Sequence, residues 1–227
     1  MNDKKINTLE NLEQPDSNSL SDVEARVMRF GHGKKYNIIY ADPPWQYNKK
    51  PNKKGRAVEC HYPTMPIDDI YNLPIESLAE ENCVLFIWVT FPKLYEGIET
   101  LKRWGFNYKT VAFVWVKTNK NTATEQFSFL PTDSFDSFWG MGNWTRSNVE
   151  ICLLGTRGKP LRRSASVHQV IYSPIDKHSK KPAEARMRIV KLMGDLPRVE
   201  LFARQKTDGW DVWGNQVESD IEVPKHA

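Results

Sequence analysis

The tetrapeptide Asp42-Pro43-Pro44-Trp45 places a carboxylate, two prolines and an aromatic ring directly after the apolar run at 36–41. The exocyclic amine of a nucleobase is a poor nucleophile, because its lone pair is delocalised into the ring. An enzyme that alkylates such an amine must therefore hold both N–H groups with acceptors. Asp42 offers one acceptor and the Pro43 carbonyl offers another, while Trp45 would stack on the base. The tetrapeptide thus predicts a catalytic turn at the end of a strand.

The two prolines should make this turn stiff. Pro43 biases Asp42 toward an extended conformation, and both proline rings fix backbone torsions without offering a competing N–H. The same sequence would also serve as a simple strand-ending turn, with Trp45 packed on the core. The tetrapeptide alone leaves both interpretations open.

Seven further segments follow in a characteristic order, at 61–65, 83–90, 142–146, 150–155, 178–182, 200–204 and 214–216. Together with the tetrapeptide they resemble the adenine-N(6) methyltransferases of the Asp-Pro-Pro-Trp type. This family is related to the 70-kilodalton catalytic subunit of the messenger-RNA adenosine methyltransferase and is common in phages and bacteria. The resemblance runs from about residue 36 to residue 216. It implies that the tetrapeptide is the catalytic motif, formed by Asp42, Pro43, Pro44 and Trp45.

The resemblance also implies S-adenosylmethionine as the methyl donor, bound at the carboxyl ends of parallel strands, where such sheets place ligands. The matching cofactor positions in this chain are Asp42, Lys181, Glu200, Leu201, Phe202, Arg204, Asn215 and Gln216. Lys181 would meet the cofactor's carboxylate. Arg204, Asn215 and Gln216 would hold its ribose and adenine side.

Basic residues gather just after the catalytic turn, at Lys49, Lys50, Lys53, Lys54 and Arg56. Their position beside the turn favours contact with the phosphates of a nucleic acid. The family-like segments add Tyr62, Trp144 and Arg146 as substrate-binding candidates. A second basic stretch, at 157–163, is better explained as a solvated face.

Apolar runs and helix-like segments alternate along the chain. Strands are predicted at 36–41, 83–90, 108–116, 149–155, 167–173 and 198–203, and helices at 67–78, 92–104 and 182–193. This alternation predicts an α/β fold with a mostly parallel sheet and helices on both faces. The resemblance implies a Rossmann-like methyltransferase fold, permuted so that the catalytic motif precedes the cofactor strand. We expect a flexible polar N-terminal segment (1–33), a catalytic domain (34–218) and a C-terminal tail (219–227).

Composition indicates a single domain with a sizeable core, since 40% of the 227 residues are hydrophobic. No apolar run approaches the roughly 18 residues that cross a membrane, and the first residues lack the pattern of a secretory signal. We therefore expect a cytoplasmic protein without a membrane partner. Two of the three cysteines, Cys83 and Cys152, lie in apolar runs and are expected in the core, and no metal site is predicted.

These patterns predict an enzyme that methylates N6 of adenine in nucleic acid, with DNA preferred to RNA because compact members resemble phage and bacterial enzymes. Three alternatives stay open. The chain could be a non-catalytic nucleic-acid-binding subunit of a heterodimer, an RNA adenosine methyltransferase, or an amine methyltransferase that acts on protein or free nucleotide. A homodimer and a heterodimer are both compatible with the sequence.

Replacing Lys49, Lys50, Lys53 and Lys54 together by Gln should weaken nucleic-acid binding whatever the base sequence. Each phosphate contact contributes about −0.7 to −0.9 to the slope of log affinity against log salt concentration, so the slope should also flatten. Binding titrations at several salt concentrations measure both quantities, with cofactor affinity as a control that should hardly move. A variant with the parent's affinity and slope would instead place the polymer along 157–163 or on a partner.

Overall fold

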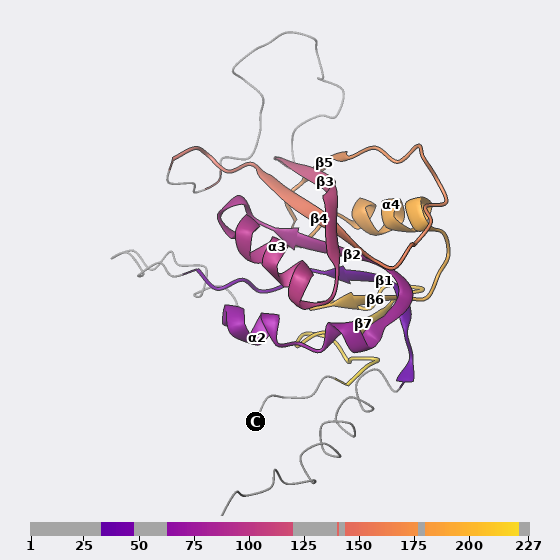
Figure 1. The fold of residues 1–227 in the computed structure, drawn as a ribbon. Coiled ribbons are helices and arrows are strands. Elements are labelled where there is room, and N and C mark those ends of the chain that lie inside the picture. Colours follow the sequence, from indigo (N-terminus) through magenta and orange to yellow (C-terminus); the bar gives the residue numbers. More distant parts are fainter. Residues whose placement is uncertain (1–32, 48–62, 120–139, 141–143, 177–179, 223–227) are drawn as a thin grey trace, which may run out of the picture.

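Seven strands of the described residues form one sheet, in the order β5-β3-β4-β2-β1-β6-β7 (Figure 1). The computed structural model describes residues 33–47, 63–119, 140, 144–176 and 180–222. The strands are β1 (Tyr36–Ala41), β2 (Ala79–Val89), β3 (Asn107–Thr118), β4 (Val149–Arg157), β5 (Val170–Pro174), β6 (Arg198–Leu201) and β7 (Asp211–Trp213). The helices are α2 (Ile67–Tyr71), α3 (Leu94–Arg103) and α4 (Ala183–Met193), with the short 3-10 helices η3 (Ile75–Leu78) and η4 (Phe91–Lys93). None of these helices is both long and apolar enough to span a membrane.

β4 is the strand that runs against its neighbours. β1 pairs in parallel with β2 and β6, β6 with β7, and β3 with β5, whereas β4 is antiparallel to both β2 and β3. Four of these six pairings are parallel, which confirms the mostly parallel sheet. Ile151, near the start of β4, pairs with Val89 at the end of β2. The start of β4 therefore reaches the edge of the sheet at which the parallel strands end.

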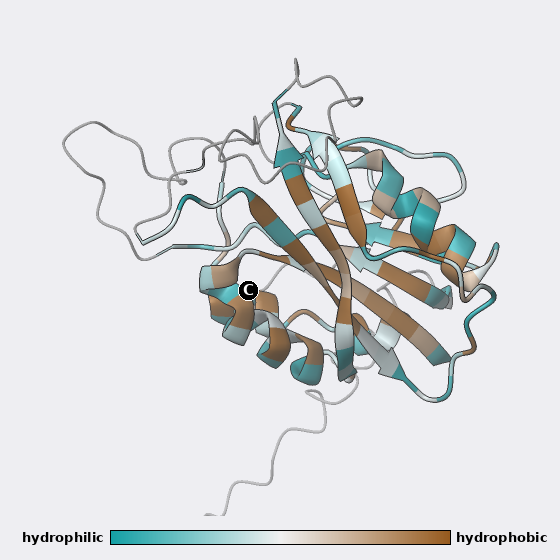
Figure 2. Ribbon diagram, turned by 90° about the horizontal axis from the view of Figure 1, so that it is seen from above, coloured by the Kyte–Doolittle hydropathy of each residue, from teal (hydrophilic) through white to brown (hydrophobic). Residues whose placement is uncertain are grey.

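The two faces of the sheet are buried beneath different helices (Figure 1). On β1, Ile39 belongs to the core layer that contains Leu101 of α3, whereas its neighbour Ile38 belongs to the layer that contains Ile189 of α4. Successive side chains of a strand point to opposite faces, so a strand buried on both sides must be apolar almost throughout. The central strands are accordingly hydrophobic along most of their length (Figure 2). Helices on both faces and the α/β Rossmann-like fold are thus confirmed.

The segments at 67–78 and 211–213 differ from the elements predicted. The helix predicted over 67–78 is split into α2 and η3, because Pro74 lacks the backbone N–H that a continuous helix would need there. The Ile75 N–H instead donates to the Leu73 carbonyl at 2.8 Å. β7 was not predicted, since three residues are too few to show a strand pattern.

The packed part of the chain extends to Ile221, which is 3% exposed. Just before it, the Asp220 carboxylate accepts a hydrogen bond from the Val212 N–H at 3.0 Å and pairs with Lys206 at 2.7 Å. Asp220 and Ile221 therefore contact the body of the fold. The division of the chain into segments stays a prediction, and residues 1–32 lie outside the described residues.

Gly97 allows α3 to approach the sheet closely. A Cβ atom at this position would lie 2.4 Å from Cγ1 of Val89 and 3.4 Å from Cδ1 of Leu153. Alanine favours a helix over glycine by about 1 kcal/mol, but overpacking a core costs about 1–3 kcal/mol.

We predict that Gly97→Ala lowers the free energy of unfolding by about 2 kcal/mol, as measured by urea titration. The 2.4 Å approach to Val89 places the overpacking cost near the upper end of its range, about 3 kcal/mol, from which the helix gain of about 1 kcal/mol is subtracted. The control Lys102→Ala, on the exposed side of α3, should change it by less than about 0.5 kcal/mol. A Gly97→Ala variant as stable as the parent would contradict the close packing of α3 on β2.

Candidate active site

The turn after β1 is fixed by backbone hydrogen bonds. Asp42 directly follows the last residue of β1. The Trp45 N–H donates to the Pro43 carbonyl at 2.9 Å, and the Met65 N–H donates to the Pro44 carbonyl at 2.9 Å. The prolines supply carbonyl acceptors and have no N–H of their own to satisfy. Asp42 is therefore held at the carboxyl end of a buried strand by a rigid turn.

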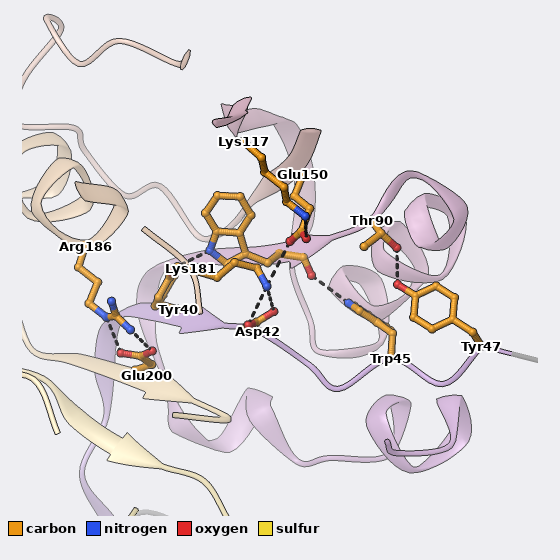
Figure 3. Close-up of polar contacts among 11 residues, drawn as sticks. Tyr40, Asp42, Trp45, Tyr47, Thr90, Lys117, Glu150, Lys181, Arg186 and Glu200 are labelled. Atoms are coloured by element: carbon orange, nitrogen blue, oxygen red, sulfur yellow. Dashed lines mark hydrogen bonds and ion pairs between the residues drawn. The ribbon is translucent and has the colours of Figure 1, made fainter. Parts of the chain in front are cut away.

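The side chain of Lys181 connects two carboxylates at this edge (Figure 3). Its Nζ lies 2.8 Å from each oxygen of Asp42 and 3.2 Å from Oε2 of Glu150. Lys117 of β3 pairs with the other oxygen of Glu150 at 2.5 Å. We call these four residues the charge network. The side chain of Lys181 is 6% exposed, so its ammonium relies on these carboxylates in place of water.

Burial and pairing act in opposite directions on the pKa values of the charge network. Burial raises the pKa of Asp42 above its ordinary value, although the ammonium of Lys181 opposes this shift. Burial also disfavours the charged form of Lys181, but the carboxylates of Asp42 and Glu150 prevail and raise its pKa. Burial opposes ionisation of Glu150 as well, yet Lys181 and Lys117 lower its pKa. Lys181 and Glu150 are therefore held in their charged forms, while Asp42 binds a proton more readily than an ordinary aspartate.

Trp45 is packed into the core in this structure. It is 4% exposed, and its Nε1–H donates to the Trp88 carbonyl at 3.0 Å. The indole N–H of Trp88 in turn donates to the Tyr40 hydroxyl at 2.6 Å (Figure 3). This placement agrees with the interpretation of Trp45 as a core residue. Its stacking on a base stays a prediction.

Two hollows meet at Asp42. The larger, of about 790 Å³, is lined by Tyr40, Asp42, Asp176, Lys180, Lys181, Arg186, Glu200, Phe202, Arg204, Gln205 and Gln216. The smaller, of about 130 Å³, is lined by Asp42, Pro44, Pro63, Met65, Phe202, Arg204, Trp213, Gly214, Asn215 and Gln216. Because Asp42, Phe202, Arg204 and Gln216 line both, the hollows are two parts of one cleft at the carboxyl ends of β1 and β6.

The family model MT-A70 matches residues 36–216, which include the cleft and the charge network. The chain belongs to the MT-A70 family of methyltransferases. It is 32% identical over 226 residues to the type II methyltransferase M.MunI of Mycoplasma sp, with 91% of this chain and 87% of that protein covered.

Eukaryotic relatives match over a smaller share of their own length. The chain is 28% identical over 187 residues to the human N(6)-adenosine-methyltransferase catalytic subunit METTL3, and 28% identical over 184 residues to an N(6)-adenosine-methyltransferase MT-A70-like protein of Arabidopsis thaliana. These matches cover 81% and 80% of this chain, but 28% and 24% of the two relatives. The chain therefore spans about a quarter of these longer MT-A70 proteins.

The residues that the family resemblance assigns to the cofactor gather at the cleft. Asp42, Lys181, Glu200, Phe202, Arg204, Asn215 and Gln216 line one or both hollows. Leu201 is fully buried in the core. Phe202 adopts a positive φ of 61° and packs edge-on against Trp213, with 5.1 Å between ring centroids. Backbone strain of this kind clusters at functional sites, although what these residues bind stays a prediction.

Most substrate-binding predictions lie outside the described residues, namely Lys49, Lys50, Lys53, Lys54, Arg56 and Tyr62. Trp144 is fully exposed and Arg146 is also exposed. In the second basic stretch, Arg157 pairs with Glu76 at 2.7 Å. The roles of all these residues in binding a substrate stay predictions.

The motifs in the sequence did not identify three charged residues of the site: Lys117, Glu150 and Arg186. Glu150 is an isolated acid next to the apolar run of β4, and Lys117 follows the apolar run of β3. A charge at such a position was the available signal, but it does not reveal the partner. The antiparallel pairing of β4 is what brings Glu150 beside Lys117 and Lys181.

We predict that Glu150→Gln lowers the free energy of unfolding at pH 7 by about 3 kcal/mol, because it leaves buried ammonium groups with fewer partners. The pKa of Glu150 is lower in the folded than in the unfolded chain. Its contribution is therefore present above the ordinary pKa of a glutamate and is lost as the pH falls through the lowered value. Urea titrations at decreasing pH should show the difference between parent and variant shrinking.

The matched control is Glu99→Gln, which breaks a surface pair with Arg103 at 3.1 Å. It should change the free energy of unfolding by about 1 kcal/mol or less. A difference between parent and Glu150→Gln that persists unchanged into acid would show that folding does not lower the pKa of Glu150.

Proposed function

We propose that this chain transfers the methyl group of S-adenosylmethionine to N6 of adenine in nucleic acid, with DNA as the preferred polymer. The observation that carries the proposal is the position of Asp42. It lines both hollows, and Lys181 holds both of its carboxylate oxygens at 2.8 Å. A fixed carboxylate where the two hollows meet can lie beside a methyl donor in the cleft and at the same time accept a hydrogen bond from the acceptor amine.

The turn offers acceptors that suit an exocyclic amine. The Pro43 carbonyl accepts one hydrogen bond from the Trp45 N–H and keeps a second lone pair. Asp42 likewise keeps acceptor capacity beyond its contact with Lys181. Acceptors on both N–H groups favour a tetrahedral nitrogen, whose lone pair is free to attack. The nitrogen must lose a proton as it gains the methyl group, and the raised pKa of Asp42 suits this residue to accept it.

The lining of the larger hollow fits S-adenosylmethionine, which carries a carboxylate, an ammonium and a sulfonium. When bound, this cofactor would supply an electrophilic methyl group. Lys180 and Lys181 present cations to a carboxylate, and Asp42 presents an acceptor to an ammonium. In the smaller hollow, Asn215 offers an amide and Trp213 offers an aromatic wall to the flat adenine of the cofactor.

Similarity to a bacterial type II methyltransferase supports DNA over RNA as the polymer. Compact members of the family resemble phage and bacterial enzymes, and this chain covers 87% of a bacterial type II methyltransferase. The N(6)-adenosine-methyltransferases that it matches are about four times longer than the shared part. In duplex DNA the target base would have to leave the stack to reach Asp42, at a cost of a few kcal/mol.

The proposal is tested by incubating the chain with labelled S-adenosylmethionine and single- and double-stranded DNA and RNA. Nuclease digestion and nucleoside mass spectrometry then identify the product. We expect N6-methyldeoxyadenosine from DNA. Product from RNA alone would overturn the choice of polymer, and label in protein or free nucleotide would overturn nucleic acid as the substrate. A chain that binds no cofactor in calorimetry would be the non-catalytic subunit instead.

Asp42→Asn should lower the rate of methyl transfer by about 10²–10³ or more, because the amide places N–H donors where the amine needs acceptors. Single-turnover assays measure this, and circular dichroism checks that the variant is folded. The control is Asp195→Asn, since Asp195 is 87% exposed and pairs with Arg198 at the opposite edge of the sheet. An Asp42→Asn variant with a rate near that of the parent would remove Asp42 from the reaction.

A further inference from the structure

A second buried ion pair stands in the wall of the larger hollow. Nε of Arg186 donates to Oε2 of Glu200 at 2.6 Å, and Nη2 donates to Oε1 at 2.5 Å (Figure 3). The two side chains are 11% and 7% exposed. Arg186 lies in the first turns of α4 and Glu200 lies on β6, so the pair joins a helix to the sheet.

Arg186 is itself held in place. Its guanidinium lies over the ring of Tyr40, 5.4 Å from the centroid, and Tyr40 is the residue of β1 that pairs with Glu200 in the sheet. The Tyr40 hydroxyl is fixed in turn by the Trp88 indole. Glu200 is therefore oriented by a group that has little freedom to move.

A gain in stability does not by itself explain why this ion pair is buried. Two charges lose much of their hydration on burial, and a buried ion pair is often no more stable than apolar residues of similar size. An arginine does, however, offer two parallel donors that fix a carboxylate in one orientation. Each oxygen of Glu200 keeps acceptor capacity after the contact with Arg186. The pair thus suits a role in recognition at the wall of the larger hollow, which both residues line.

We propose that Arg186 is a positioning residue that holds Glu200 so that its carboxylate accepts a hydrogen bond from a ribose hydroxyl of the adenosyl ligand. This inference rests on the proposed function. Because Arg186 acts through Glu200, losing it should affect mainly the discrimination between ligands with and without that hydroxyl. Loss of a residue with a purely structural role would weaken the binding of all these ligands alike.

The test uses the full chain and calorimetry with S-adenosylhomocysteine and its 2′-deoxy and 3′-deoxy forms. For the parent we expect one deoxy form to bind at least about tenfold more weakly, the loss expected for a hydrogen bond to a charged group. In Arg186→Lys the donors no longer form a planar fork. The ratio of the dissociation constant of that deoxy form to that of S-adenosylhomocysteine should then fall below about threefold. Unfolding temperatures of both proteins are measured in parallel.

The matched control is Arg188→Lys on the same helix. Arg188 pairs with Glu184 at 2.6 Å and donates to the carbonyls of His168 and Val170, outside the residues that line the two hollows. It should keep the ratio of the parent. If Arg186→Lys does not fold, Arg186→Gln is measured in its place with the same expectation.

The outcomes separate the two proposals. A parent that binds no S-adenosylhomocysteine overturns the proposed function, and this inference with it. A parent that binds it and prefers the full ribose, while a folded Arg186 variant keeps the whole preference, overturns the inference alone. A parent that binds all three ligands equally also overturns it.

Discussion

The ammonium of Lys181 is the group on which the site depends, because it is almost sealed from water and lies between carboxylates from different parts of the sheet. Removing such a charge from water costs several kcal/mol, and only close, well-directed partners offset that cost. Asp42 follows β1 and Glu150 lies on β4, with β2 between these strands in the sheet. Contacts of 2.8 and 3.2 Å therefore require the registers of three strands to be correct together.

The strands could be predicted because burial on both faces makes them continuous apolar runs, as in 83–90. The direction of β4 could not be predicted, since a strand buried on both faces is a continuous apolar run whether its pairing is parallel or antiparallel. This reversal matters for the candidate site, because it brings the start of β4 to the edge where β1 and β2 end. The break between α2 and η3 was missed even though Pro74 signals it, because the apolar spacing on either side continues the helical pattern.

Short motifs pointed to two residues that the structure brings together, Asp42 directly after β1 and Lys181 just before α4, although what they bind stays a prediction. Glu150 and Arg186 could not be assigned, because only the fold brings each of them beside its ion-pair partners. The burial of Trp45 was one of two interpretations that the sequence left open, since a tryptophan after two prolines suits packing and stacking alike. Its environment depends on the Trp88 carbonyl, which lies at the end of another strand and accepts the indole N–H.

Trp88 connects the turn after β1 to two residues that line the larger hollow, Tyr40 and Lys181. Its carbonyl anchors Trp45, its indole N–H anchors Tyr40, and its ring lies 5.9 Å from the ammonium of Lys181. Methyl transfer requires the reacting atoms to be held about 3–3.5 Å apart and aligned, so small displacements are costly. Aromatic side chains have few torsions and bury large surfaces, which makes them suitable supports for such alignment. In the proposed reaction, the core beneath Asp42 therefore positions the reacting groups as directly as the charged residues around them.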